Sequence, residues 1–134
     1  MNNETSLLIE KYYQAFNQKN YEGMLELLSE DVSHDINQGK RIPGKKAFRE
    51  FLQRMDFLYD ENLTDIVIMT DASGKRASAE FICNGTYKNT DEGLPPARGQ
   101  TYKIPVGTFF DINGGKITRV TNYYNLNDWI KMVK

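Results

Sequence analysis

The chain has 134 residues with 17 basic and 18 acidic side chains, which gives a formal net charge of −1. This length predicts a single domain, residues 1–134, that can bury roughly two-thirds of its unfolded surface and so form a core with room for a ligand. The charge balance lacks the basic excess of proteins that bind nucleic acid or an anionic membrane, so neither is expected as a partner.

The N-terminus and the cysteine content bear on the cellular compartment. The segment MNNETSLLIEKYYQ lacks the basic stretch and apolar run of a signal peptide. The sequence also lacks a run of about 18 apolar residues that could span a bilayer. Cys83 is the only cysteine and cannot form an internal disulfide, and its alternating context predicts a small buried side chain in a strand. We expect a cytoplasmic protein.

Apolar residues recur at helical spacing in three N-terminal segments. Residues 6–20 and 21–31 predict two helices joined by a polar turn. Residues 44–55 predict a third helix, which begins at Gly44 because Pro43 prevents an earlier start. Between them, residues 32–37 alternate as a strand, which places His34 on one face and Asp35 on the other.

The second half of the chain has the alternation of β-strands. Residues 63–70 and 76–87 flank the turn DASGK, in which we expect a positive φ at Gly74. Residues 99–112 and 116–125 flank NGG, a strong hairpin signal. Residues 126–134 predict a short terminal helix with Asn127 as a possible cap. This order predicts an α+β fold, in which three N-terminal helices pack on a curved antiparallel sheet with a pocket between them.

Three segments carry a resemblance to a known family: the helix–helix–strand start, DINQGKRIPGKKAFREFL and GKITRVTNYYNLNDWI. Through them the chain resembles the NTF2-like superfamily, and more narrowly its ketosteroid isomerase-related and SnoaL-like proteins. The resemblance implies the NTF2-like cone as the fold. The superfamily includes isomerases, dehydratases, epoxide hydrolases, polyketide cyclases and non-catalytic binders, so the fold alone does not decide the activity.

The resemblance also implies catalytic residues. In ketosteroid isomerases an aspartate that precedes a glycine by nine positions is the base, and Asp35 precedes Gly44 by nine. A tyrosine on the first helix donates to the developing enolate; Tyr12 is the closest match and Tyr13 is the alternative. Asp35 in an apolar cavity would have a raised pKa and would accept a proton from a carbon next to a carbonyl. The other interpretation of Asp35 is a strand-end carboxylate bonded to the following turn.

The chain departs from the family pattern at the second acid. The position of the isomerases' protonated aspartic acid falls near Gly107, and the acid of the SnoaL-like cyclases falls on Asn122 or Asn125. An amide cannot make that proton transfer. Gln100 and Asn122 could instead donate amide hydrogen bonds to a substrate oxygen.

His34 is the only histidine, and two interpretations fit it. It is either a structural residue or a pocket residue that acts as an acid or orients the ligand. One histidine without a second histidine or cysteine ligand makes a poor metal site, so we expect no metal, and no organic cofactor is implied.

Several further polar and aromatic residues fall on the predicted sheet. Tyr87, Tyr102 and Tyr124 are candidate substrate-binding residues, because a tyrosine combines an apolar ring with a polar tip. The alternative is that they belong to the core and to a dimer surface. Glu80 is expected to form a structural cross-strand pair with Arg119.

These patterns lead to one functional hypothesis and two alternatives. The leading hypothesis is an isomerase- or lyase-type enzyme that acts on a small apolar or aromatic carbonyl compound, with Asp35 as the proton carrier. A non-catalytic binder of small apolar ligands is the alternative, and a protein-interaction subunit is the weaker third. The resemblance implies a homodimer packed sheet to sheet, and the composition agrees, because the sheet is too apolar to face water on both sides.

Overall fold

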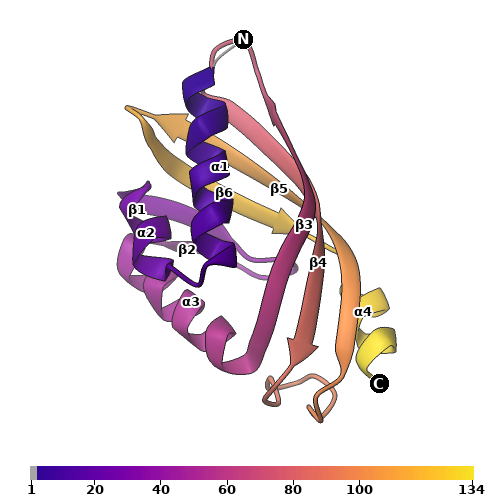
Figure 1. Cartoon of the computed structure of the whole chain (residues 1–134). Coiled ribbons are helices and arrows are strands. Elements are labelled where there is room, and N and C mark those ends of the chain that lie inside the picture. The colour runs from indigo at the N-terminus through magenta and orange to yellow at the C-terminus, as the bar shows by residue number, and fades with distance from the viewer. Residues whose placement is uncertain (1–2) are drawn as a thin grey trace.

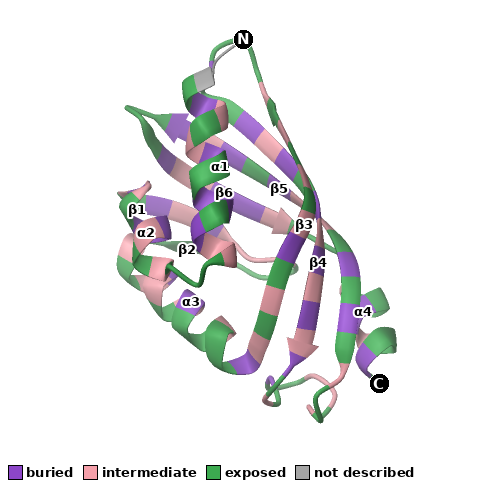
Figure 2. Ribbon diagram, viewed as in Figure 1, coloured by how far each residue is buried: buried purple, intermediate pink, exposed green. Residues whose placement is uncertain are grey.

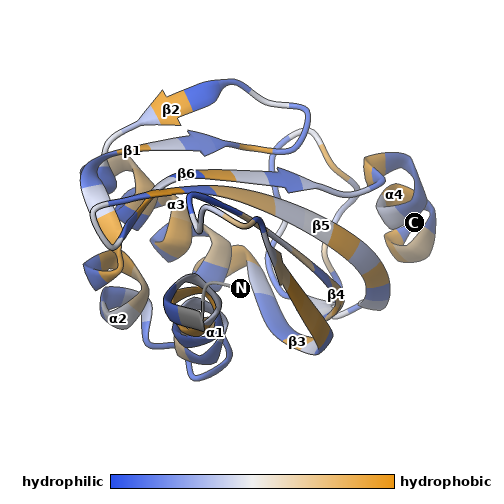
Figure 3. Ribbon diagram, turned by 90° about the horizontal axis from the view of Figure 1, so that it is seen from above, coloured by the Kyte–Doolittle hydropathy of each residue, from blue (hydrophilic) through white to orange (hydrophobic). Residues whose placement is uncertain are grey.

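The computed structural model describes residues 3–134. Four helices and six strands follow in chain order: α1 (Asn3–Asn17), α2 (Tyr21–Glu26), β1 (Leu28–Asp35), β2 (Arg41–Pro43), α3 (Lys45–Leu58), β3 (Tyr59–Thr70), β4 (Arg76–Tyr87), β5 (Thr101–Asn113), β6 (Lys116–Tyr123) and α4 (Leu126–Val133). The predicted α+β fold is confirmed: α1, α2 and α3 lie on one side of a curved sheet (Figures 1 and 3).

The strands form one sheet in the order β2-β1-β6-β5-β4-β3. Strands β3 to β6 are the predicted antiparallel meander. The N-terminal part differs from the prediction, because β1 pairs parallel with β6 and a second short strand, β2, pairs with β1. With only three residues, β2 is too short for a sequence pattern to reveal.

The turns and helix ends follow from local chemistry. Gly74, Gly114 and Gly115 take the positive φ that tight turns between strands require, which confirms both predicted hairpins. Gly44 precedes the first turn of α3, also at positive φ. The cap of α4 lies two residues earlier than predicted: Asn125, not Asn127, accepts the N–H of Asp128 at 3.1 Å.

Alternation gives the sheet two distinct faces. The face covered by α1 and α3, here called the concave face, carries the odd-numbered residues of β4 from Ala77 to Tyr87, every one of which is buried (Figure 2). The opposite, convex face carries the even-numbered residues of β4 and their partners. All later assignments to a face follow from the strand pairing.

Helix α1 and strand β3 are fastened to each other at the edge of the sheet. The side-chain amide of Asn17 donates to the carbonyl of Leu63 at 3.0 Å and accepts its N–H at 2.8 Å. Lys19 donates to the backbone carbonyl of Glu61 at 2.6 Å and pairs with the carboxylate of Asp60 at 3.2 Å. These contacts satisfy backbone groups of β3, which is the last strand in the order of the sheet.

Candidate functional site

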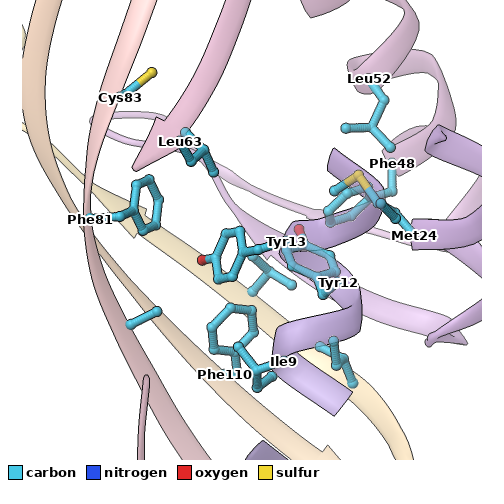
Figure 4. Close-up of a cluster of buried hydrophobic side chains, with 14 of the residues drawn as sticks. Ile9, Tyr12, Tyr13, Met24, Phe48, Leu52, Leu63, Phe81, Cys83 and Phe110 are labelled. Carbon is cyan, nitrogen blue, oxygen red and sulfur yellow. The ribbon is translucent and has the colours of Figure 1, made fainter. Parts of the chain in front are cut away.

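The aromatic core fills the concave face beneath α1. Tyr12 and Tyr13 are both buried, and their rings meet Phe110 edge-on (Figure 4). The ring of Tyr13 also lies 5.0 Å from that of Phe81. Burial raises the pKa of both tyrosines above the ordinary range, so both hydroxyls remain protonated donors.

One polar group lies inside this apolar region. Thr108 is fully buried on β5, and its hydroxyl donates to Oδ1 of Asn122 on β6 at 2.9 Å. The buried hydroxyl of Tyr13 interacts with Thr108, yet it has no hydrogen bond of ordinary geometry among the described residues. Tyr13, Thr108 and Asn122 are here called the inner polar group. The family resemblance places the isomerases' protonated aspartic acid near Gly107. Gly107 faces the convex side, whereas its neighbour Thr108 faces the concave side, so Thr108 is the polar residue at this place in the core.

A second polar group lies further along the concave face, and of its members only Tyr102 was named as a candidate from the sequence. Tyr102 donates its hydroxyl to Oε2 of Glu61 at 2.5 Å, and the thiol of the buried Cys83 lies beside the same carboxylate. Burial, followed by the charge of Glu61, raises the pKa of both Cys83 and Tyr102. Glu61, Cys83 and Tyr102 are here called the outer polar group.

The outer polar group depends on Gly85. A Cβ at this position would lie 2.1 Å from Cζ of Tyr102, so only glycine lets the tyrosine ring cross β4 to reach Glu61 on β3. The sequence held a signal for this contact, because a glycine inside a strand often marks a close approach. Alternation from Leu63 also places Glu61 on the buried face.

An aromatic cluster closes the same end of the concave face. Trp129 of α4 packs edge-on against Tyr59, Tyr87 and Tyr102. Tyr124 follows β6 and carries a pKa raised first by burial and then by the charge of Glu61. The five tyrosines named from the sequence therefore differ in place: Tyr12 and Tyr13 are buried on α1, Tyr87 and Tyr102 lie on the concave face, and Tyr124 follows β6 and is 37% exposed.

Tyr87 and Gln100 have structural partners. The Tyr87 hydroxyl donates to the carbonyl of Pro95 at 2.7 Å and accepts the N–H of Asp91 at 2.9 Å. The Gln100 amide donates to the carbonyls of Pro96 and Val133. These bonds hold the loop between β4 and β5 and the end of α4, so we assign both residues to that loop and not to a substrate.

His34 lies on the concave side of β1 in an apolar contact. Its ring stacks on Phe48 at 4.3 Å and meets Phe51 edge-on at 4.6 Å, and only 2% of the residue is exposed. Burial lowers its pKa to about 4, so the imidazole is neutral near pH 7. Between the two interpretations, the contacts favour the structural one.

Asp35 does not have the environment that the sequence predicted. It lies on the convex face, where Arg41 binds both carboxylate oxygens at 2.7 and 2.9 Å and the Thr121 hydroxyl donates at 2.6 Å. The hydrogen bond from Arg41 is the main cause that lowers the pKa of Asp35 to about 2. The predicted rise in pKa is therefore wrong. A carboxylate held in this way is a weak base.

The predicted pair between Glu80 and Arg119 is also wrong. Arg119 binds both carboxylate oxygens of Asp111, at 2.9 and 3.0 Å, and Asp111 also pairs with Arg76. Glu80 is exposed on β4. The register across β5 explains the difference, because Asp111 lies directly opposite Arg119 whereas Glu80 lies opposite Gly107.

Two hollows open at the surface. One, of about 400 Å³, is lined by polar residues of the convex side that include Asn62, Asn84 and Thr101, and also by Tyr102 of the outer polar group. The other, of about 540 Å³, lies between the start of α1 and the hairpin turns at Gly74 and Gly114.

The described residues hold no group of three or more histidine, cysteine or acidic side chains arranged for a metal ion. None of the described helices is long and apolar enough to cross a membrane.

Comparison with known proteins shows the family of the chain. The SnoaL-like domain matches residues 9–120. The chain belongs to the SnoaL-like family. This SnoaL-like protein is 52% identical to a protein from Xanthomonas campestris pv. campestris that is provisionally named a polyketide cyclase; the match covers 98% of each chain, with a TM-score of 0.96.

Two further solved structures are similar to the SnoaL-like protein. A second provisionally named polyketide cyclase, from Pseudomonas putida KT2440, is 56% identical over 95% of this chain and 96% of its own, with a TM-score of 0.94. An NTF2-like protein from Burkholderia xenovorans LB400 shares the fold at 14% identity and a TM-score of 0.79, over 100% of this chain and 98% of its own. No curated protein matches the chain. The resemblance to NTF2-like and SnoaL-like proteins is thus confirmed.

Proposed function

We propose that the protein is a small-molecule enzyme of the isomerase, lyase or cyclase type, which moves a proton at a carbon next to a carbonyl on the concave face of the sheet. The names of the relatives from Xanthomonas and Pseudomonas agree with this class of chemistry. The substrate is an apolar or aromatic carbonyl compound, because the concave face is lined by aromatic rings with a few hydroxyl and amide groups between them.

The inner polar group carries this proposal. A buried hydroxyl without a well-formed hydrogen bond costs the folded state about 1–3 kcal/mol. Tyr13 is such a group, and Thr108 and Asn122 lie beside it. A carbonyl oxygen of a bound molecule would accept the Tyr13 O–H, and it would be held more tightly as it gains negative charge.

The chemical step is a proton transfer. A carboxylate removes the proton, the C–H electron pair forms the carbon–carbon double bond of an enolate, and the carbonyl π pair moves to the oxygen. Return of the proton to the same or another carbon completes exchange or isomerisation. Attack of the enolate carbon on a second carbonyl forms the new carbon–carbon bond of a cyclisation, and the oxygen of that carbonyl then takes the proton back from the carboxylic acid. Asp35 was the predicted carrier, but its ion pair with Arg41 on the convex face argues against it.

Hydrogen–deuterium exchange tests the proposal. Cyclic ketones, enones, steroids and 1,3-diketones would be incubated with the protein in D₂O, and NMR would report exchange at carbons next to carbonyls. Enzyme-dependent exchange that falls in Tyr13→Phe supports the proposal. Compounds that bind but never exchange would instead favour the non-catalytic ligand-binding alternative.

We also propose that the protein is a homodimer that packs through the convex face. Four apolar or aromatic residues of this face are partly exposed, with between 43% and 58% of each residue accessible to solvent: Val67, Met69, Phe109 and Tyr123. The rings of Phe109 and Tyr123 contact each other at 5.8 Å. A second copy of the sheet would remove this apolar surface from water.

A further inference from the structure

We propose that Glu61 is the proton-transfer carboxylate of this protein and that Tyr102 is the residue that positions it. The inference rests on the proposed function and supplies the base that Asp35 does not provide. Glu61 lies on the concave face, and its residue is only partly buried, so a substrate can reach the carboxylate. Asp35, in contrast, lies on the convex face and is neutralised by Arg41.

The backbone around Glu61 is held in place from two sides. Lys19 binds the Glu61 carbonyl, and two residues further along β3 the Asn17 amide exchanges two hydrogen bonds with Leu63. These contacts come from the end of α1 and fix the edge strand on which Glu61 sits. A proton-transfer group needs this rigidity, because a displacement of about 1 Å can cost a hundredfold in rate.

The carboxylate itself is oriented by Tyr102. The hydroxyl of Tyr102 donates to one oxygen, Oε2, at 2.5 Å. The hydrogen bond from Tyr102 engages Oε2 alone, and the thiol of Cys83, a weak donor, faces the same carboxylate, so Oε1 can still take the proton of a substrate. A group that engaged both oxygens, as Arg41 does at Asp35, would leave no such position.

The position of Glu61 also constrains the substrate. Tyr102, which meets Glu61, and Thr108 of the inner polar group are six positions apart on β5, which corresponds to roughly 20 Å along a strand. This is a separation of backbones, and the side chains span part of it, so an extended molecule with more than one carbonyl suits the two groups better than one small ring ketone. One carbonyl would lie at the inner polar group, and another would present its neighbouring C–H to Glu61.

The test compares Glu61→Gln with Glu80→Gln in the full chain. Both replace a carboxylate by an amide of the same shape, but Glu80 is exposed on the convex face. Wild type and both variants would be incubated in D₂O with cyclohexanone and with linear polyketones of increasing length. We expect exchange to fall at least a hundredfold in Glu61→Gln, to be unchanged in Glu80→Gln, and to be faster for the longer compounds.

A second variant separates catalysis from folding. Tyr102→Phe keeps the ring over Gly85 and removes only the hydroxyl. The titratable groups that face Glu61 are Lys19, Tyr21, Cys83, Tyr102 and Tyr124. Loss of the Tyr102 donor weakens the support for the charged carboxylate, so the acidic limb of the pH–rate profile should move to higher pH. A purely structural role of Tyr102 would lower the rate at every pH without moving this limb.

Binding gives a readout that does not depend on turnover. In protein with ¹³C-labelled glutamate side chains, the Glu61 signal is the one missing from Glu61→Gln. An added polyketone should shift this signal and leave that of Glu80 in place. Exchange that persists in Glu61→Gln would overturn the assignment of Glu61 while the proposed function stands. Compounds that neither exchange nor shift the signal would overturn the proposed function, and the role of Glu61 with it.

Discussion

The side chains of His34 and Asp35 leave β1 on opposite faces of the sheet. His34 lies between Phe48 and Phe51 on the concave side, whereas Asp35 is bound by Arg41 on the convex side. The two neighbours therefore titrate in opposite environments, one depleted of water and the other rich in positive charge. They cannot act as one acid–base pair, and each makes its own contribution to stability.

Because His34 is buried, the folded protein should lose stability as the pH falls from 6.5 to 4. Its pKa is about 4 in the folded protein and near 6.5 when unfolded, so the unfolded chain binds the additional proton in this window. The stabilisation is complete above pH 6.5 and falls by up to about 3 kcal/mol as the pH drops to 4. Urea unfolding of the wild type and of His34→Leu measures it. A wild-type curve that is flat across this window would contradict the burial of His34.

Asp35→Asn should lower stability without affecting proton exchange. The folded pKa of Asp35 is about 2, so its contribution is present above pH 3.8 and is lost as the pH falls toward 2. We expect a loss on the order of 1 kcal/mol at pH 7, because the pair is partly exposed to solvent. Asp31→Asn, at an exposed position on the same strand, is the control. Loss of exchange in Asp35→Asn would restore Asp35 as the base.

Tyr13→Phe should retain or increase stability while it reduces exchange. The change removes a buried hydroxyl that lacks a well-formed hydrogen bond, so the free energy of unfolding should change by roughly 0 to +1 kcal/mol. Tyr12→Phe is the matched control, since Tyr12 is its neighbour and equally buried. A larger loss of exchange in Tyr12→Phe would identify Tyr12 as the residue that binds the carbonyl oxygen.

Gly85→Ala should separate Tyr102 from Glu61. The new Cβ would overlap the tyrosine ring, and such overpacking costs about 1–3 kcal/mol of stability. Gly107→Ala is the control, because a Cβ at Gly107 would meet no heavy atom within 4 Å. Thermal unfolding and exchange assays would be run on both. Equal behaviour of the two variants would mean that the ring of Tyr102 does not occupy the space above Gly85.

Tyr123→Glu should convert the dimer to a monomer. Tyr123 is 58% exposed on the convex face, and a charge there could not be buried against a second sheet without a partner. Phe57→Glu is the control, since Phe57 is at least as exposed as Tyr123 but lies on α3. Light scattering at micromolar concentration gives the mass. A wild-type protein that is monomeric under these conditions would contradict the proposed dimer.

Local patterns were sufficient for most elements of this protein, except for β2 and for the start of β1, which lies inside the predicted helix 21–31. The spacing of apolar residues in 6–20 and 44–55 predicted α1 and α3, and the glycines at 74, 114 and 115 predicted the hairpins. Alternation also placed His34 and Asp35 on opposite faces. These features depend on the 3.6- and 2-residue periods and on the φ preferences of glycine, all of which act within a few residues.

Tertiary structure alone decided which side chains meet. Arg41 reaches Asp35 because β2 folds back on β1, and Arg119 faces Asp111 because of the register between β5 and β6. The contact between Tyr102 and Glu61 joins residues 41 positions apart across a glycine on a third strand. Sequence patterns state which face a residue occupies, but partner choice depends on register and curvature, which are set by packing across the whole sheet.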